Sequence, residues 1–414
     1  MANLRNQLDI AIVGAGPGGL ATALFLHRAG HRATVFERFD TAHPVGSGLM
    51  LQPTGLAVLQ ALGLDGQIGQ LGARVDRLTG TDSRSGRTVL DVGYAPLGPN
   101  VHALAVHRAA LFNVLHSAVQ RKGIALVTGF TATAMTTGET GHWLQSDRGR
   151  EGPFDLIVDA SGARSPLRVA ARFPPKPRPL TYGAIWSTVP WVDSGFDRHA
   201  LSQRYRKSSV MIGVLPVGRQ TGDGPELAAF FWSLKPESYD GLRARGIAAW
   251  HDEVLSHWPE TAPHLSHMAS FEQMNLARYA HETLRVPAGT GIGFVGDSAH
   301  CTSPQLGQGA NMALLDAAAL ATALDRAGSV AEALELYCRF RRWHVRFYQF
   351  MSLALTPFYQ SDSRTLPFVR DVLVSGIGKL PPVAALLAQL VSGQMLRPLR
   401  AISLAPVTSA DRAA

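Results

Sequence analysis

The first 40 residues combine short apolar runs with one amphipathic segment. Residues 10–13 form an apolar run typical of a buried strand, residues 18–29 have helical spacing, and Gly30 ends that helix. Residues 32–36 predict a second strand, which Glu37 closes. The pattern therefore predicts a β-α-β unit at the start of the chain.

The rest of the chain switches between helical and strand-like patterns. Helical spacing occurs in residues 53–62, 108–122, 241–258, 311–326 and 330–351, and an apolar, helical tail follows. Alternating positions with turn signals indicate strands within residues 73–105, 124–143, 154–160, 183–189, 208–217 and 227–234. Residues 294–296 predict a strand that returns to the first unit. This order predicts an α/β fold with a β-rich insertion.

A glycine-rich turn joins the first strand to the first helix. Gly14 allows the tight turn, Gly16 lets the backbone approach a pyrophosphate, and Gly19 allows the helix to pack closely on the strand. The amides and the positive dipole end of this helix would point at the phosphates. An acid at the end of the second strand can accept hydrogen bonds from a ribose. We expect a dinucleotide to contact Gly14, Gly16, Pro17, Gly18, Gly19, Glu37 and Arg38.

A second glycine-rich stretch begins about 280 residues further along the chain. Asp297 follows a strand end and precedes small residues, so its carboxylate can face a polyol. Gly307, Gly309 and Asn311 offer backbone amides at a helix start, where such groups stabilise negative charge. Two segments of this kind in this order favour a flavin enzyme over a nicotinamide dehydrogenase.

Four motifs together resemble the group A FAD-dependent aromatic hydroxylases, which have the fold of para-hydroxybenzoate hydroxylase. They are the first glycine-rich turn, the His107-Arg108 pair, residues 155–168, which are similar to the family's DG motif, and the segment that begins at Gly296. The resemblance covers most of the chain. It implies a discontinuous Rossmann-like FAD-binding domain, an inserted β-sheet substrate domain and a helical C-terminal part. These would comprise residues 1–180 with 286–345, residues 181–285 with a contribution from 73–105, and residues 346–414.

The resemblance also implies roles for individual residues. Arg108 would reach the FAD pyrophosphate, Asp297 would contact the ribityl chain, and Pro304 would lie near the isoalloxazine ring. Ser161 stands where the family's DG motif has aspartate, which leaves the choice between NADPH and NADH open. The remaining implied FAD contacts are Gly162, Gly307, Gly309, Ala310 and Asn311.

The implied activity is that of an FAD-dependent monooxygenase. NADPH or NADH would reduce the flavin, O₂ would add to give a flavin C4a-hydroperoxide, and one oxygen atom would pass to an electron-rich ring by hydroxylation or epoxidation. The cofactor carries the difficult chemistry, and the protein must hold the substrate and exclude water. We therefore expect an apolar aromatic or polycyclic small molecule as substrate, and no metal.

Aromatic and apolar residues of the β-rich insertion are candidates for the substrate pocket. Alternation along a strand does not reveal which face lines a cavity, so core packing is the competing interpretation for each residue. Tyr205 is a candidate for orienting or deprotonating a phenol. Gln52 resembles a residue of a loop near the flavin in the family. The predicted pocket residues are Gln52, Trp186, Met211, Phe231 and Trp232.

Composition and charge narrow the class of protein. The 414 residues allow two or three structural units, and the 2 cysteines provide no disulfide framework. The net charge of +8 comes mostly from scattered arginines, which disfavours nucleic-acid binding. A denser spot at residues 339–342 is typical of a solvated helix face, or of a field that attracts NADPH or an anionic membrane. Without a long unbroken apolar run, we expect a cytoplasmic protein.

Several alternatives stay open at this point. A flavoprotein reductase or dehydrogenase of the same fold would consume reductant without inserting oxygen, and a catalytically silent flavin-binding protein would not consume it at all. The C-terminal segment 347–362 is somewhat similar to the tail of the ubiquinone-pathway hydroxylases, which leaves transient membrane contact open. The sequence is compatible with a monomer and with a homodimer.

Overall fold

The structure is a computed structural model that describes residues 7–42, 46–174, 178–378 and 380–406. Its main sheet has six strands in the order β20-β21-β12-β1-β2-β8, all parallel to their neighbours except β20. The parts of the predicted domains at residues 1–6, 43–45, 175–177, 379 and 407–414 lie outside the described residues. The strands are β1 (Asp9–Val13), β2 (Arg32–Phe36), β8 (Ala125–Val127), β12 (Leu156–Asp159), β20 (Ala288–Gly289) and β21 (Ile292–Phe294).

Two different layers cover this sheet because alternate side chains of its strands point to opposite faces. Ile10 and Ile12 of β1 belong to the core beneath the helices. Ala11 and Val13 belong to a second core, under a three-stranded antiparallel sheet. That sheet consists of β9 (Ala132–Gly138), β10 (Gly141–Ser146) and β11 (Gly149–Phe154).

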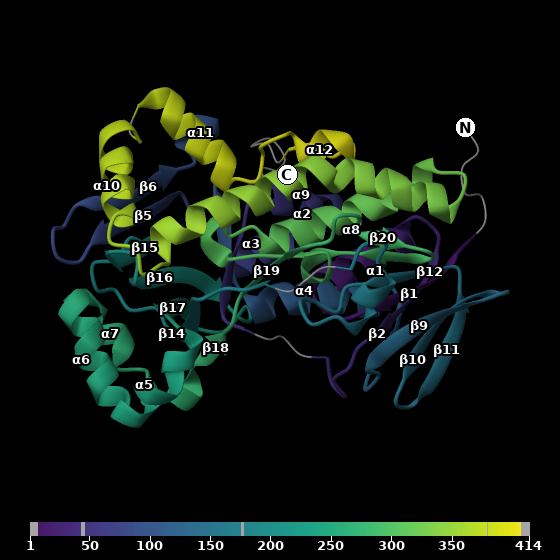
Figure 1. The fold of residues 1–414 in the computed structure, drawn as a ribbon, viewed down its shortest axis with the longest axis horizontal. Helices are drawn as coiled ribbons and strands as arrows, with labels where there is room; N and C mark the ends of the chain where they lie inside the picture. Colours follow the sequence, from purple (N-terminus) through teal and green to yellow (C-terminus); the bar gives the residue numbers. More distant parts are fainter. Residues whose placement is uncertain (1–6, 43–45, 175–177, 379, 407–414) are drawn as a thin grey trace.

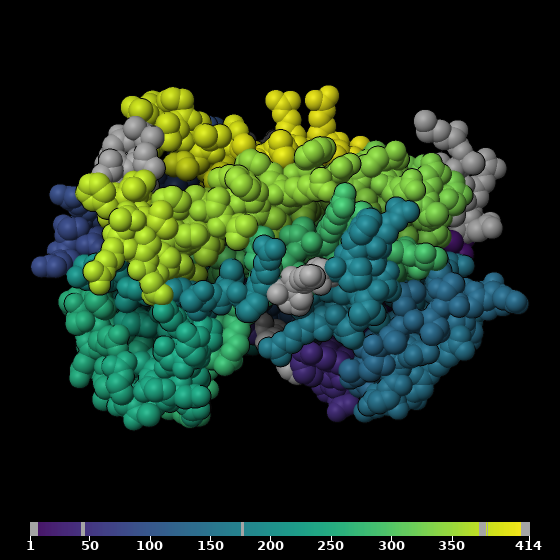
Figure 2. Space-filling model, viewed as in Figure 1, coloured from purple at the N-terminus to yellow at the C-terminus, as the bar shows by residue number. Residues whose placement is uncertain are grey.

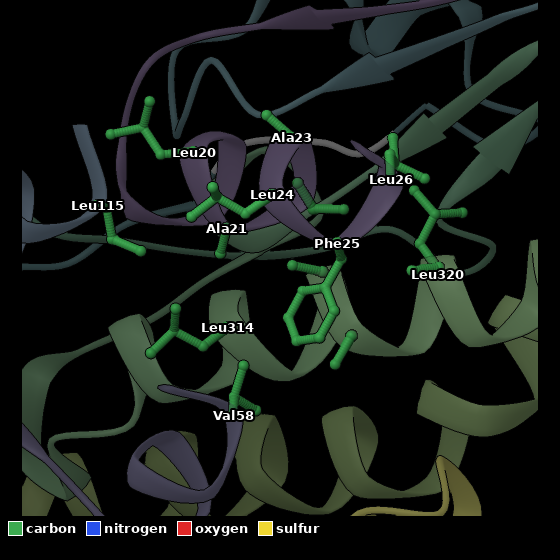
Figure 3. Close-up of a cluster of buried hydrophobic side chains, with 14 of the residues drawn as sticks. Leu20, Ala21, Ala23, Leu24, Phe25, Leu26, Val58, Leu115, Leu314 and Leu320 are labelled. Atoms are coloured by element: carbon green, nitrogen blue, oxygen red, sulfur yellow. The ribbon is translucent and has the colours of Figure 1, made fainter. Parts of the chain in front are cut away.

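Helix α1 (Pro17–Arg28) lies at the centre of the helical layer. Its apolar side chains, among them Leu24 and Phe25, contact residues from three other helices, including Leu314 and Leu320 of α8 (Figure 3). This packing fixes the direction in which the start of α1 points. The neighbouring helices are α2 (Pro53–Ala61), α4 (Arg108–Arg121) and α8 (Gly309–Arg326), with the short α3 (Asp65–Leu71) beside α4.

A seven-stranded mixed sheet forms the second large layer, in the order β18-β14-β17-β16-β15-β5-β6. Two strands from within residues 73–105 extend it, because β5 pairs in parallel with β15. One face packs on β3 and β7, and the other is covered by short helices (Figure 1). The strands are β5 (Arg77–Asp82), β6 (Thr88–Gly93), β14 (Gly183–Pro190), β15 (Ala200–Arg206), β16 (Val210–Arg219), β17 (Glu226–Leu234) and β18 (Asn275–Ala277).

The prediction of a single helix at residues 241–258 is wrong. Two helices occupy this stretch, α5 (Tyr239–Arg245) and α6 (Ile247–His257). Gly246 separates them with a φ of +87°, a left-handed conformation that glycine adopts without strain. Trp250 of α6 is fully buried and packs against Phe230 and Trp232 of the sheet.

Two small sheets and several single turns connect these layers. The first has the order β3-β7-β4 and the second β13-β19-β22. Their strands are β3 (Gly48–Leu51), β4 (Ala73–Val75), β7 (Ala103–His107), β13 (Arg178–Pro179), β19 (Ala280–Thr283) and β22 (His300–Cys301). The remaining turns are α7 (Ala262–Leu265) and the 3₁₀ segments at 95–97, 166–170, 236–238, 259–261, 271–273, 296–298 and 304–306.

The C-terminal helices lie along one side of the molecule. Helix α9 (Val330–Tyr359) has 30 residues and crosses most of its length in Figure 1. It extends eight residues beyond the predicted end at Met351 and contains Pro357 in its last turn. Helices α10 (Leu366–Ile377), α11 (Pro381–Val391) and α12 (Pro398–Ala401) follow, and α10 and α11 cover β6. Within the described residues, no helix is both long and apolar enough to cross a membrane.

The predicted α/β class is confirmed.

Candidate functional site

The glycine-rich turn after β1 is built so tightly that only glycine fits at two positions. Gly14 has a φ of +104°, and a Cβ there would lie 2.6 Å from the carbonyl oxygen of Ala160. A Cβ on Gly19 would lie 1.9 Å from the carbonyl oxygen of Gly14. Gly16 differs, because no atom lies within 4 Å of the position that its Cβ would take. The turn is thus closed towards the protein and open at Gly16, where a pyrophosphate would approach.

Glu37 closes the other side of this turn. Its side chain is buried at the end of β2, and the backbone amides of Ala15 and Phe39 donate to its two oxygens at 2.8 Å and 3.2 Å. The carboxylate therefore stands beside the glycine turn, with acceptor capacity left for hydroxyl groups. The guanidinium of Arg38 is exposed and stacks 4.7 Å from the Phe39 ring centroid.

Arg108 contributes a positive charge to the same region. It begins α4, its backbone amide donates to Ser47, and its side chain passes over Gly46, where a Cβ would lie 2.7 Å from the Arg108 Cδ. The side chain is exposed, and no carboxylate of the described residues forms an ion pair with it. An exposed guanidinium without such a pair suits a phosphate ligand.

The DG-like segment carries a carboxylate at a different position from the one in the family motif. Asp159 ends β12 with no exposed surface, and it accepts hydrogen bonds from the Ser161 amide at 2.9 Å, the Ser161 hydroxyl at 2.6 Å and the Ser165 hydroxyl. Burial raises the pKa of Asp159, although these hydrogen bonds oppose the shift. Sequence reasoning noticed Ser161 and missed Asp159. The signal was an acid at the end of an apolar strand.

The Gly296–Ser298 turn presents Asp297 to solvent. The buried Arg168 fixes this turn by donating to the backbone carbonyls of Asp297 at 2.6 Å and Ser298 at 2.8 Å, and it pairs with Glu282. The Asp297 side chain is exposed, so its carboxylate is free to meet a hydroxylated ligand. Gly18 of the first turn lies nearby, because a Cβ there would contact Val295 and Ala313. The two glycine-rich segments therefore meet in space.

Asn311 ties the start of α8 to β3. Its side-chain nitrogen donates to the backbone carbonyls of Met50 and Gly307, each at 2.9 Å, and its side-chain oxygen accepts from the backbone N–H of Gln52 at 2.7 Å. These bonds fix the turn between Pro304 and Gly309, in which Gly307 is left-handed with a φ of +60°. The amides of Gly309 and Ala310 lie in the first turn of the helix, where the dipole favours negative charge.

A buried tyrosine that sequence reasoning missed orients Gln52. The Tyr94 hydroxyl donates to the Gln52 Oε1 at 2.7 Å, and both side chains have no exposed surface. Burial raises the pKa of Tyr94, which keeps this donor protonated. The Gln52 Nε2 has no hydrogen-bond partner in the described part of the chain, and it lies 3.6 Å from the position of a Cβ on Gly307. An unpaired buried donor of this kind calls for a partner, such as a bound water or a ligand atom.

The predicted pocket residues of the seven-stranded sheet separate onto two faces. Trp186, Met211 and Phe231 lie with Met50 in the cluster on the face that packs on β3. The ring centroids of Trp186 and Phe231 are 4.6 Å apart, and Trp186 donates to the Tyr279 hydroxyl. Trp232 does not join them, because successive side chains of a strand point in opposite directions. It packs against Trp250 on the far face, which contradicts its predicted place in the pocket.

Tyr205 lies in an enclosed position beneath the C-terminal helices. Its ring centroid is 5.7 Å from that of Tyr359 and 5.3 Å from the Arg370 guanidinium. Burial raises the pKa of Tyr205 well above its usual value, followed by the effect of Tyr359. These surroundings do not favour Tyr205 as a base.

A buried network of charged and polar side chains supports the Gly296–Ser298 turn on the side that faces α8 and α9. Asp316 of α8 accepts from the Gly296 amide, from the His300 Nε2 at 2.6 Å and from the Arg341 Nε at 2.6 Å. Burial opposes the ionisation of Asp316, but the charges of His300 and Arg341 lower its pKa to about 2. Arg341 also contacts His344, whose Nε2 lies 3.0 Å from the Gly393 carbonyl oxygen. The network connects the Gly296 turn with α9.

Comparison with known proteins identifies relatives over most of the chain. Residues 7–344 match the family model described as FAD binding domain. An aurachin C monooxygenase/isomerase of Stigmatella aurantiaca is 26% identical over 345 residues, which are 81% of this chain and 85% of the relative. A 3-amino-4-hydroxybenzoate 2-monooxygenase of Streptomyces cremeus is 28% identical over 347 residues, 80% of this chain and 82% of the relative.

Solved structures share the fold. The tetrameric form of 2-methyl-3-hydroxypyridine-5-carboxylic acid oxygenase superposes with a TM-score of 0.78 at 21% identity, covering 95% of this chain and 98% of that one. Klebsiella pneumoniae HpxO with FAD and uric acid gives 0.78 at 19% identity, covering 93% and 97%. The predicted fold and the predicted class, FAD-dependent monooxygenase, are confirmed. The glycine-rich turns, the exposed Arg108 and the family match lead to one conclusion: this chain belongs to the FAD binding domain family of flavoproteins.

Proposed function

We propose that this chain, an FAD-dependent monooxygenase, uses NADPH or NADH and O₂ to hydroxylate or epoxidise an apolar aromatic or polycyclic small molecule. The observation that carries the proposal is that the two glycine-rich segments meet beside an aromatic face of the seven-stranded sheet. The names of the relatives describe monooxygenases, one of them acting on 3-amino-4-hydroxybenzoate. The bound FAD would supply the activation of O₂, and the protein would position the ring and keep water away.

Each part of the FAD has residues suited to hold it. The open backbone at Gly16 and the Arg108 guanidinium would hold the pyrophosphate, and Glu37 would accept from the adenosine ribose. Asp297 would accept from the ribityl hydroxyls. The implied remaining contacts are Gly14, Pro17, Gly18, Gly19, Arg38, Gly162, Pro304, Gly307, Gly309, Ala310 and Asn311.

Replacing Arg108 by Gln should weaken FAD binding about tenfold without unfolding the protein. The guanidinium is exposed and free of an ion pair with the described carboxylates, so its loss removes a phosphate contact and no internal bond. Flavin fluorescence titration of the apoprotein measures the dissociation constant. Arg121→Gln, at the exposed end of the same helix, is the matched control. Equal affinities for the two variants would contradict the proposed role of Arg108.

The substrate would lie against the face that carries Trp186, Met211 and Phe231, with the Gln52 Nε2 as a hydrogen-bond donor at its edge. Aromatic residues around an apolar pocket with a few placed polar groups are typical of small-molecule sites. The unpaired Nε2 would donate a hydrogen bond to an acceptor atom of the substrate or of the flavin.

Gln52→Leu tests this donor. The variant removes a donor that lacks a partner within the described residues, and it also removes the acceptor of the buried Tyr94 hydroxyl. We therefore expect the KM for the substrate to rise about tenfold and the free energy of unfolding to fall by about 1–3 kcal/mol. We also expect more of the consumed reductant to appear as H₂O₂. Gln60→Leu, on α2, is the control. A Gln52→Leu enzyme with unchanged KM and unchanged H₂O₂ would rule out a donor role.

A reductase or dehydrogenase of the same fold is the alternative. It would oxidise NADPH or NADH without a ring product that contains new oxygen. Oxidation of NADPH and of NADH in air, with and without a panel of phenols and quinolones, separates the two. Stimulation by a ring compound with little H₂O₂ supports the monooxygenase, and oxidation that is independent of O₂ supports the alternative.

A further inference from the structure

A pocket on the side of α9 lies apart from the two glycine-rich turns. It has a volume of about 270 Å³ and lies between residues 283–287 and the middle of α9, the long helix across the front of Figure 2. Its inner wall includes Ala299 and His300, which follow the Gly296 turn. None of the residues assigned above to the FAD or the substrate lines it.

Arginines surround the mouth of this pocket. Three of them, Arg339, Arg342 and Arg346, occupy positions i, i+3 and i+7 of α9 and therefore share one face of the helix. Arg285 lines the opposite side. None of the four forms an ion pair with a carboxylate of the described residues. Arg172 is also near, because its charge acts on the pocket residue Cys338, as does the opposite charge of Glu335.

Aromatic rings hold several of these guanidinium groups at the surface. The Arg285 guanidinium stacks 5.1 Å from the Phe173 ring centroid, and those of Arg342 and Arg346 lie 5.3 Å and 5.7 Å from the Trp343 ring. Stacking leaves the N–H groups of a guanidinium free for a second partner in its plane. Like charges around one pocket repel one another, and an anion between them lowers this repulsion.

The inner part of the pocket has a different character. Its acid, Asp316, forms an ion pair with Arg341 and has no exposed surface, so it does not repel an incoming anion strongly. The other inner residues offer mainly carbon atoms. They are Leu284, Val286, Pro287, Tyr337 and Val345.

We propose that this pocket binds an organic phosphate, with the phosphate between the arginines of α9 and Arg285 and a ring or chain against the apolar wall. Guanidinium groups bind phosphate through paired hydrogen bonds, and several arginines can share the oxygens of one phosphate. The inference is independent of the reaction proposed above. A soluble nucleotide and a phospholipid headgroup share this chemistry.

Binding of ADP and of inorganic pyrophosphate to the full chain carrying one equivalent of FAD tests the proposal by calorimetry. We expect both to bind, ADP more tightly, with an affinity that falls as salt rises. Arg342→Gln/Arg346→Gln should weaken both at least about tenfold. Arg84→Gln/Arg87→Gln removes the same charge from the exposed turn after β5 and should leave binding unchanged.

Vesicles distinguish the two sources of the phosphate. Flotation with phosphatidylglycerol in phosphatidylcholine that depends on Arg342 and Arg346, without ADP binding, would assign the pocket to a lipid headgroup. ADP binding without flotation would assign it to a soluble phosphate. The proposal is overturned if ADP, pyrophosphate and vesicles all fail to bind, or if the two double variants bind them equally.

Discussion

Asp316→Asn is expected to lower the free energy of unfolding by about 3–5 kcal/mol, because it removes the carboxylate that pairs with the buried Arg341 and accepts from the buried His300. Asp316 has no exposed surface and accepts from His300, Arg341 and the Gly296 amide. An asparagine cannot neutralise Arg341, which is itself only 2% exposed. Urea unfolding of the apoprotein measures the loss. Asp325→Asn, at an exposed position of the same helix, should change stability by less than about 0.5 kcal/mol.

The difference in unfolding free energy between the wild type and Asp316→Asn should depend on pH. The pKa of Asp316 is about 2 in the folded protein and about 3.9 in an unfolded chain, so its ionisation stabilises the fold above pH 4. This stabilisation is lost as the pH falls from about 4 towards 2. The difference in stability between the wild type and Asp316→Asn should therefore shrink over that range. A difference that stays constant from pH 7 to pH 2.5 would show that Asp316 acts through packing alone.

Gly16→Val is expected to weaken FAD binding about a hundredfold, or about 2.7 kcal/mol, in a protein that still folds. Gly16 has φ −70° and ψ 174°, an extended conformation that valine adopts readily. No protein atom lies within 4 Å of the new Cβ, so the side chain fills only the space through which a pyrophosphate would approach. Unfolding of the apoprotein should be unchanged.

The controls for Gly16→Val separate sterics from folding. Gly66→Val, on the exposed side of α3, also points into open space and should keep full FAD affinity. Gly19→Ala should fail to fold properly, because its Cβ would lie 1.9 Å from the Gly14 carbonyl oxygen. A Gly16→Val protein that binds FAD like the wild type would mean that the pyrophosphate lies elsewhere.

Local patterns in the sequence predicted the parts of the site that are continuous in the chain. The β-α-β unit and its glycine turn follow from neighbouring residues, because the left-handed φ of Gly14 and the close contact of Gly19 with the Gly14 carbonyl oxygen both arise within the turn itself. The start of α8 was predictable for the same reason. The structure begins this helix at Gly309, two residues before the predicted start at Asn311.

Tertiary contacts determined what the sequence could not reveal. Gln52 and Tyr94 are 42 residues apart. Asp316 and Arg341 meet because α8 and α9 pack side by side, and His300 reaches Asp316 from β22. Alternation along β17 predicted a strand but did not distinguish the face of Phe231 from that of Trp232. The break at Gly246 was hidden because the helical spacing continues on both sides of it.

Incorporation of oxygen from ¹⁸O₂ into a ring product is the most direct test of the proposed activity. The FAD-loaded protein would be incubated with NADPH or NADH and with a ring compound that stimulates reductant oxidation, and the product analysed by mass spectrometry. We predict a mass increase from one ¹⁸O atom per product molecule. Oxidation of the ring compound with no ¹⁸O, or with oxygen derived only from water, would contradict the assignment as a monooxygenase.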